Sequence, residues 1–191
     1  MLSQAKTLTA SEVSRLLAEI QHNRYPVRDR LMLLMTYYAG LRVGEVASLT
    51  IGDVANSDGG IKSEIRLKRR QTKGGKTRTV MISTRLATEI EAYLAVHHGP
   101  LDRPLFVSQK TNDRFTVVGM ANLFKSIYKI AGLDNASSHS GRRTFITTLA
   151  GSGISVRVIQ ELAGHSDMST TQRYIDVNDI DKSSAVNSIR Y

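Results

Sequence analysis

Residues 61–83 read IKSEIRLKRRQTKGGKTRTVMIS, and their pattern differs from that of the sequence on either side. From 61 to 68, small or apolar residues alternate with charged ones, which is typical of a half-buried strand. A second strand is indicated over 77–83, and the Gly74–Gly75 pair between the two strands is a turn signal. We therefore predict an antiparallel β-hairpin whose exposed face and tip are strongly basic.

Helical patterns occupy the sequence on both sides of this hairpin. Thr9 stands three residues before Glu12, the signature of a capping box at a helix N-terminus. A second helix is expected after Pro26, ending at Gly40. Further helices are expected at 42–49, 83–98, 116–131, 140–151, 155–164 and around Tyr174. The fold class that follows is α+β but mostly α, a single domain over residues 1–191 with one small antiparallel sheet.

The composition of the chain excludes several classes of protein. At 191 residues with 41% hydrophobic content, it is long and apolar enough to fold around one core. No apolar run approaches the roughly 18 residues of a membrane span, and no secretion signal opens the chain. With no cysteine, disulfides and thiolate metal sites are excluded. These features suit a cytoplasmic protein of a bacterium or phage.

The charge of the chain favours a polyanionic partner. Twenty-six Lys and Arg against seventeen Asp and Glu give a net charge of +9 and a pI near 10.0. Such a surplus favours nucleic acid first and an anionic membrane second. On net charge alone, a merely soluble basic protein is an equal alternative. The clustering favours nucleic acid, because eight of the seventeen residues 62–78 are Lys or Arg.

Five polar side chains outside the hairpin are candidates for chemistry. They are Arg42, His139, Arg142, His165 and Tyr174. Taken singly, each has an ordinary explanation as a surface arginine, a solvated helix start, a helix cap or an amphipathic aromatic. Together with a lysine on the hairpin turn, they suit phosphoryl transfer without a metal. Arginine forks bind phosphate oxygens, a phenol of pKa about 10 needs cationic surroundings to become a nucleophile, and a lysine can protonate a departing alkoxide.

Three segments carry a resemblance to a known family. They are AGLRVGEVASL (39–49), HSGRRTF (139–145) and LAGHSDMSTTQRY (162–174). In this order, with a basic hairpin between the first two, the chain resembles the catalytic domain of the tyrosine recombinases, the phage integrase family. The resemblance runs over most of the chain, 7–177. Larger members carry a separate DNA-clamping domain before the catalytic one, so we expect either an excised catalytic domain or a compact member without that domain.

The resemblance implies a role for each candidate residue. Tyr174 would attack a scissile DNA phosphate and form a 3′-phosphotyrosyl link, making the protein a site-specific recombinase of integrase or invertase type. Arg42 and Arg142 would clamp the nonbridging oxygens. His139 would accept or hold the tyrosine proton. His165, nine residues before the tyrosine (174 − 165 = 9), would hydrogen-bond the phosphate.

Further roles come from the same resemblance. Glu45 would orient its cationic neighbours. Lys73 would protonate the leaving oxygen, with Lys76 close enough to leave the choice of general acid open. No metal, ATP or other cofactor is expected, because the covalent link conserves the energy of the broken bond. DNA contacts are expected from Lys68, Arg69, Arg70, Lys76, Arg78 and Arg143.

The implied partners are double-stranded DNA and further copies of this chain. The family exchanges strands between two duplexes as a tetramer on DNA, with accessory DNA-bending proteins as candidate partners. The segment 179–191 has a thin apolar stripe, and we expect it to dock on a neighbouring subunit. The protein would be associated with the nucleoid, and site layout and accessory proteins would decide between integration, excision, inversion and dimer resolution.

Other classes of protein remain as alternatives or fail on spacing. A type IB topoisomerase would use nearly the same residues to relax DNA, and a DNA-binding regulator would keep the fold with a silent site. GGKT (74–77) would need a glycine at position 70 to form a P-loop, and that residue is Arg70. A zinc site built from histidines lacks cysteines and any matching ligand spacing. No metal site is expected.

Overall fold

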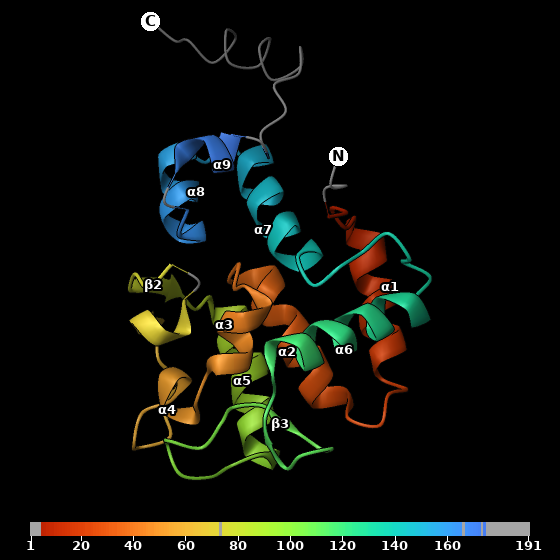
Figure 1. Cartoon of the computed structure of the whole chain (residues 1–191), viewed down its shortest axis with the longest axis vertical. Helices are drawn as coiled ribbons and strands as arrows, with labels where there is room; N and C mark the ends of the chain where they lie inside the picture. Colours follow the sequence, from red (N-terminus) through yellow and green to blue (C-terminus); the bar gives the residue numbers. More distant parts are fainter. Residues whose placement is uncertain (1–4, 73, 166, 173, 175–191) are drawn as a thin grey trace, which may run out of the picture. The chain divides into compact units, whose positions relative to one another are not determined.

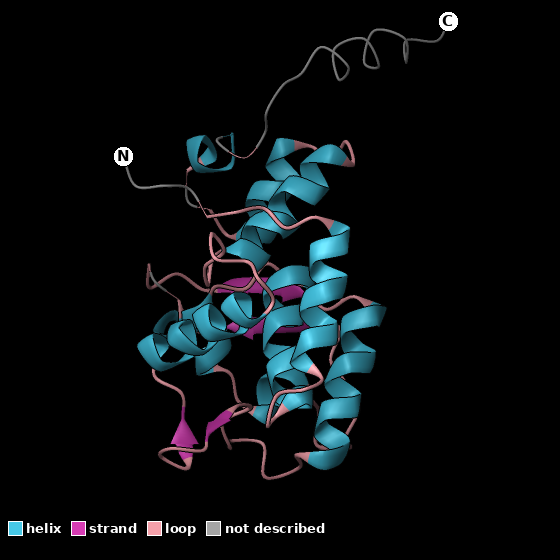
Figure 2. Cartoon of the chain, turned by 90° about the vertical axis from the view of Figure 1, so that its right-hand side faces the viewer, coloured by secondary structure: helices cyan, strands magenta, loops and turns pink. Residues whose placement is uncertain are grey.

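The computed structural model describes residues 5–72, 74–165, 167–172 and 174. The chain divides into two compact units, Met1–Phe145 and Ile146–Tyr191. The boundary falls inside one helix, α7 (Ser140–Gly151), and each unit is described by itself below (Figure 1). Helices predominate among the described residues, and the strands are short (Figure 2).

The first unit opens with two helices whose ends follow from the sequence. Helix α1 (Ala10–Ile20) begins at Thr9, whose hydroxyl accepts from the backbone N–H of Glu12 while the Glu12 carboxylate accepts from that of Thr9. Helix α2 (Pro26–Tyr38) has proline at its first position and is followed by Gly40 in the left-handed region, at φ 59°. The predicted capping box and glycine stop are confirmed.

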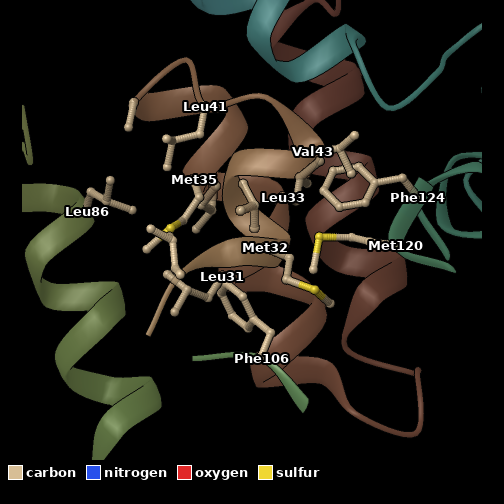
Figure 3. Packing of buried hydrophobic residues seen from close by; sticks show 14 of the residues in the cluster. Leu31, Met32, Leu33, Met35, Leu41, Val43, Leu86, Phe106, Met120 and Phe124 are labelled. Atoms are coloured by element: carbon tan, nitrogen blue, oxygen red, sulfur yellow. The ribbon is translucent and has the colours of Figure 1, made fainter. Parts of the chain in front are cut away.

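Helix α2 forms the centre of the hydrophobic core of this unit. Its residues Leu31–Met35 are all at most 2% exposed, so the helix is buried on every side rather than along one stripe. Helices α1, α3 (Val43–Ser48) and α5 (Thr84–Val96) pack against it. Figure 3 shows side chains of α2 together with Val43 of α3, Leu86 of α5, and Met120 and Phe124 of α6 (Val117–Ile130). This packing holds the segment after α2 against a rigid base.

The predicted hairpin is present and shorter than expected. Strands β1 (Glu64–Leu67) and β2 (Arg78–Met81) pair antiparallel, with Leu67 opposite Arg78. The alternation is confirmed, because Ile65 and Leu67 are buried while Arg66 between them is exposed. The strand pattern predicted from 61 does not continue the hairpin, because Ile61 makes an isolated bridge with Ala55 instead.

Several short elements are not part of the sequence prediction. Helix α4 (Ile51–Val54) follows α3, and a 3₁₀ turn at Arg69–Gln71 follows β1. A second antiparallel sheet joins β3 (Val107–Ser108) to β4 (Asp113–Arg114), so the expectation of a single sheet is wrong. Helical turns of three or four residues and strands of two are too short to show the hydrophobic period of their element.

The second unit contains the end of α7 and two shorter helices. Helix α8 (Val156–Ala163) begins at Ser155, whose hydroxyl accepts from the backbone N–H of Val158. It ends at Gly164, which adopts the left-handed conformation at φ 62°. Helix α9 (Met168–Gln172) follows. Across the part of the chain that the structure describes, no helix has the length and apolarity needed to cross a bilayer.

Candidate active site

Arg42 and Glu45 are joined by two hydrogen bonds at the start of α3. Arg42 is the N-cap of this helix, and its backbone N–H donates to Glu45 Oε2 at 2.8 Å. Its Nη1 donates to Glu45 Oε1 at 2.9 Å. The Glu45 side chain is 2% exposed, whereas that of Arg42 is 26% exposed. The guanidinium is therefore anchored at one end and still reaches the surface.

Arg78 approaches the same carboxylate from the hairpin. Its Nε donates to Glu45 Oε1 at 3.2 Å and its Nη2 to Oε2 at 2.7 Å, a two-pronged ion pair. Burial raises the pKa of the Glu45 carboxyl, but the hydrogen bond and charge of Arg78, followed by those of Arg42, outweigh it and lower the pKa below its ordinary value. Glu45 is thus held as a carboxylate between two arginines.

Arg142 is held by the chain segment that precedes Arg42. It lies in the first turn of α7, is 5% exposed, and its Nη1 donates to the main-chain carbonyl of Gly40. The neighbouring Gly141 packs so closely on α2 that an added Cβ would lie 2.1 Å from Thr36 Oγ1. Segment 40–45 therefore supplies partners to both arginines that the sequence singles out.

The N-terminal segment is hydrogen-bonded to the same end of α7. The backbone N–H of Leu8 donates to Thr144 Oγ1 at 2.9 Å, and Arg143 Nε donates to Thr7 Oγ1 at 3.0 Å. His139 comes just before the helix, is exposed, and its backbone N–H donates to Ser137 Oγ at 3.3 Å. The His-x-x-Arg segment thus combines an exposed histidine with a buried arginine three residues later.

Two side chains stabilise the hairpin turn by donating hydrogen bonds to its main-chain carbonyls. Thr72 Oγ1 donates to the Lys76 carbonyl at 2.7 Å, and Arg69 Nε donates to the Gly75 carbonyl at 2.8 Å. Lys73 and the predicted docking segment 179–191 lie outside the described residues.

The side chains expected to contact DNA differ in exposure. Four of these residues are exposed, namely Lys68, Arg69, Arg70 and Lys76. The side chain of Arg78, in contrast, is only 9% exposed.

In the second unit, His165 and Tyr174 lie together. Their rings are nearly parallel, 19° apart in plane, with centroids separated by 6.0 Å. His165 Nδ1 is 2.9 Å from the hydroxyl of the fully buried Thr171, and the Tyr174 backbone N–H donates to the Thr171 carbonyl at 3.0 Å. The His165 carbonyl also accepts from Gln160 Nε2 at 3.1 Å. One buried threonine therefore orients both residues of the last motif.

Three features of the site have no counterpart in the sequence analysis. The Gly40 carbonyl and the Arg78 pairing act through long-range contacts that no local pattern encodes, and the role of Thr171 was not predicted. Thr171 carries one usable signal, because a threonine on the buried side of a polar helix needs a partner for its hydroxyl. Within the described ranges, no three His, Asp or Glu side chains lie close enough together to hold a metal ion.

Comparison with known sequences identifies relatives over nearly the whole chain. A model of the phage integrase family matches residues 6–180. Tyrosine recombinase XerA of Pyrococcus horikoshii is 38% identical over 179 residues, covering 92% of this chain and 58% of the relative. Tyrosine recombinase XerC of Pelobacter propionicus is 36% identical over 160 residues, covering 83% and 50%. The chain thus spans little more than half the length of these curated relatives.

Comparison with solved structures also finds recombinases and an integrase. The crystal structure of XerA recombinase matches with a TM-score of 0.77 at 26% identity, over 100% of this chain and 68% of that chain. XerH site-specific recombinase bound to its difH substrate matches with a TM-score of 0.72 at 22% identity, over 100% and 56%. A lambda integrase dimer bound to a core site gives 0.72 at 16% identity, over 92% and 61%. At the lower identities, the likeness concerns the fold.

Proposed function

The chain belongs to the phage integrase family, and on that premise we propose that it is a site-specific DNA recombinase whose nucleophile is Tyr174. The observation that carries the proposal is the shared anchoring of two arginines by segment 40–45. Arg42 is bound by Glu45, and Arg142 is bound by the Gly40 carbonyl. Two guanidinium groups fixed by one short segment suit a phosphate clamp, because preorganised cations stabilise developing charge without moving.

The reaction exchanges one phosphodiester for another. The Tyr174 oxygen forms a bond to the scissile phosphorus, and the bond from phosphorus to the 5′-oxygen breaks. The phenolic proton passes to His139, and the departing oxygen takes a proton from Lys73 or Lys76. Attack by the 5′-hydroxyl of another strand reverses the step, so the phosphotyrosyl link conserves the bond energy and no ATP or other cofactor is consumed.

The remaining residues orient the reacting groups. Arg42 and Arg142 bind the nonbridging oxygens of the phosphate, since planar guanidinium forks match paired oxygens and stay charged at any working pH. The Nδ1 atom of His165 is engaged by Thr171, so the proposed phosphate contact falls to Nε2. Glu45 keeps Arg42 in place.

The substrate we propose is double-stranded DNA, exchanged by a tetramer of this chain. The exposed basic residues around the hairpin turn, Lys68, Arg69, Arg70 and Lys76, would contact its phosphates, and Arg143 would contact them beside α7. Segment 179–191 would dock on a neighbouring subunit, and DNA-bending proteins would shape the complex. The protein would act in the cytoplasm, beside the nucleoid.

Covalent trapping tests the proposal. Nicked duplexes tiled from the DNA that flanks the gene would be incubated with the parent protein and with the Tyr174→Phe variant. We expect an adduct that resists SDS with the parent and none with the variant, since only the phenol can form the link. DNA binding without an adduct on any duplex would contradict the recombinase proposal and favour a silent DNA-binding regulator.

A second variant tests the clamp. Removing one guanidinium with Arg142→Ala should slow adduct formation by about 10²- to 10³-fold, the cost of losing one preorganised donor to the reacting oxygens. The rate is measured with the protein saturating the duplex, so that weaker binding does not contribute. If Arg142→Ala formed the adduct as fast as the parent, Arg142 would not be part of the phosphate clamp.

A further inference from the structure

We propose that Arg78 is a positioning residue that fixes Arg42 through the carboxylate of Glu45, and so ties the phosphate clamp to the β-hairpin. This inference rests on the proposed function and adds to it a residue and a coupling between two elements. It also differs from the sequence analysis, which expected Arg78 to contact DNA. Three observations carry it.

The first observation is the shared carboxylate. Each oxygen of Glu45 accepts one hydrogen bond from Arg42 and one from Arg78, so all four bonds depend on one orientation of the carboxylate. With Arg78 removed, the carboxylate keeps its two bonds to Arg42 but loses the fork that sets its plane. The Arg42 guanidinium, whose Nη1 donates to this carboxylate, would then be held in a less fixed direction.

The second observation is the burial of Arg78. Its side chain is 9% exposed, although the other basic residues that the structure describes between 64 and 81 are exposed. On the paired strand, the side chain of Arg66 is 83% exposed. A buried guanidinium engaged by both prongs presents little surface to a DNA phosphate. Its position therefore fits a role inside the protein.

The third observation is the place of Arg78 in the hairpin. It is the first residue of β2 and pairs with Leu67, the last residue of β1. The turn 72–77, which carries the candidate general acids, ends immediately before it. Fixing Arg78 on Glu45 therefore fixes one end of that turn relative to Arg42. One ion pair would align the group that binds the phosphate with the segment that protonates the leaving oxygen.

The test separates chemistry from DNA binding. Arg78→Met removes the fork, Arg78→Lys keeps the charge without the two-pronged geometry, and Arg66→Met is the matched control on the opposite strand. Single-turnover adduct formation gives the rate with saturating protein, and a DNA titration gives the dissociation constant. Thermal unfolding of each variant establishes that the protein assayed is folded.

We expect Arg78→Met to slow adduct formation by about 10- to 100-fold, the range found when an outer-shell partner that orients a metal ligand is lost. The dissociation constant should change less than about twofold, since no phosphate contact is lost. Arg78→Lys should recover part of the rate, and Arg66→Met should react like the parent. A rate unchanged in folded Arg78→Met, or a loss that appears only in the dissociation constant, would overturn the proposal.

A double-mutant cycle identifies Glu45 as the intermediary. In a Glu45→Gln background, adding Arg78→Met should reduce the rate by less than about threefold, because the carboxylate that transmits its effect is already gone. Full additivity of the two losses would show that Arg78 acts by another route. If Arg78→Met alone folds poorly, Arg78→Lys takes its place in the cycle, because it keeps a positive charge beside Glu45.

A measurement without DNA keeps the inference distinct from the proposed function. The Nε–H resonance of Arg42 in ¹⁵N spectra should shift and broaden in Arg78→Met and stay in place in Arg66→Met. If the parent forms no adduct on any duplex, the recombinase proposal fails while this spectrum still tests the positioning of Arg42. An Arg42 resonance that is identical in the parent and Arg78→Met would overturn the inference even in an active protein.

Discussion

The carboxylate of Glu45 is the point at which two distant stretches of the chain meet. Arg42 is three residues away and could be paired with it from sequence, because the motif places the two together. Arg78 is 33 residues away, and the alternation of β2 places it on the face of the buried Val80 without indicating its partner. Long-range ion pairs of this kind depend on the packed fold and carry no local signal.

The lowered pKa of Glu45 predicts a pH-dependent stability. A carboxylate whose folded pKa lies below its ordinary value of 4.5 stabilises the fold fully above that value and loses the contribution as pH falls through the folded pKa. The charged groups that face it are the guanidinium groups of Arg42 and Arg78. Urea unfolding at pH 7 should therefore place Glu45→Gln about 3 kcal/mol below the parent, the cost of breaking a buried pair.

The comparison at lower pH provides the check. Well below pH 4, protonation removes the charge of Glu45 in the parent, so the difference in unfolding free energy between the parent and Glu45→Gln should shrink. A difference of the same size at both pH values would mean that the ion pairs with Arg42 and Arg78 contribute nothing to it.

At the scale of elements, the ends of helices were the most predictable features. The capping box of α1 and the glycine after α2 follow from side-chain and backbone chemistry within a few residues. The hairpin followed from its alternation, although its strands are shorter than that pattern indicates. Helix α4 and the second sheet were missed, because tertiary hydrogen bonds, such as that of the Gly52 N–H to the Leu101 carbonyl, shape that region.

The close approach of α7 to α2 predicts a large cost for one methyl group. In Gly141→Ala the new Cβ would lie 2.1 Å from Thr36 Oγ1 and 3.1 Å from its Cβ, so one of the helices must shift. We expect a loss of about 1–3 kcal/mol in unfolding free energy, as for other overpacked cores. Adding Thr36→Ala should recover part of it, because the closest atom is then gone.

The same helix offers a matched control. In Gly151→Ala an added Cβ meets nothing within 4 Å, so only helix propensity changes. This variant should gain about 0.5–1 kcal/mol, the usual advantage of alanine over glycine in a helix. If both substitutions changed stability by the same amount, contact with Thr36 would not be the cause of the Gly141→Ala effect.

At the scale of the whole molecule, the prediction of one domain over 1–191 stays a prediction. The chain forms two units, and the candidate residues are divided between them, with the arginines in the first and His165 and Tyr174 in the second. Sequence order identified the set as a whole because the motifs are local. Their partners, such as Thr171 and the Gly40 carbonyl, became visible only in the structure.

The net charge of +9 predicts salt-dependent DNA binding. Each phosphate contact releases condensed counterions, so the logarithm of the binding constant should fall linearly with that of the salt concentration. Replacing Lys68 and Arg70 with glutamine should lower the slope by about 0.9 for each lost contact. Arg78→Met should leave the slope unchanged, and a slope near zero in the parent would exclude phosphate-driven binding.

The hydrogen bond from Arg142 to the Gly40 carbonyl has a consequence for mutational scanning. Its acceptor belongs to the main chain, so every side-chain substitution at position 40 leaves the acceptor in place and reports instead on the left-handed conformation and on the close approach of the Phe145 ring. A deep mutational library can remove the donor, but substitution of Arg142 also removes the proposed phosphate clamp, so the library cannot isolate this contact. Semisynthesis that replaces the following amide with an ester would weaken the carbonyl as an acceptor, and would expose a dependence that genetics alone cannot reach.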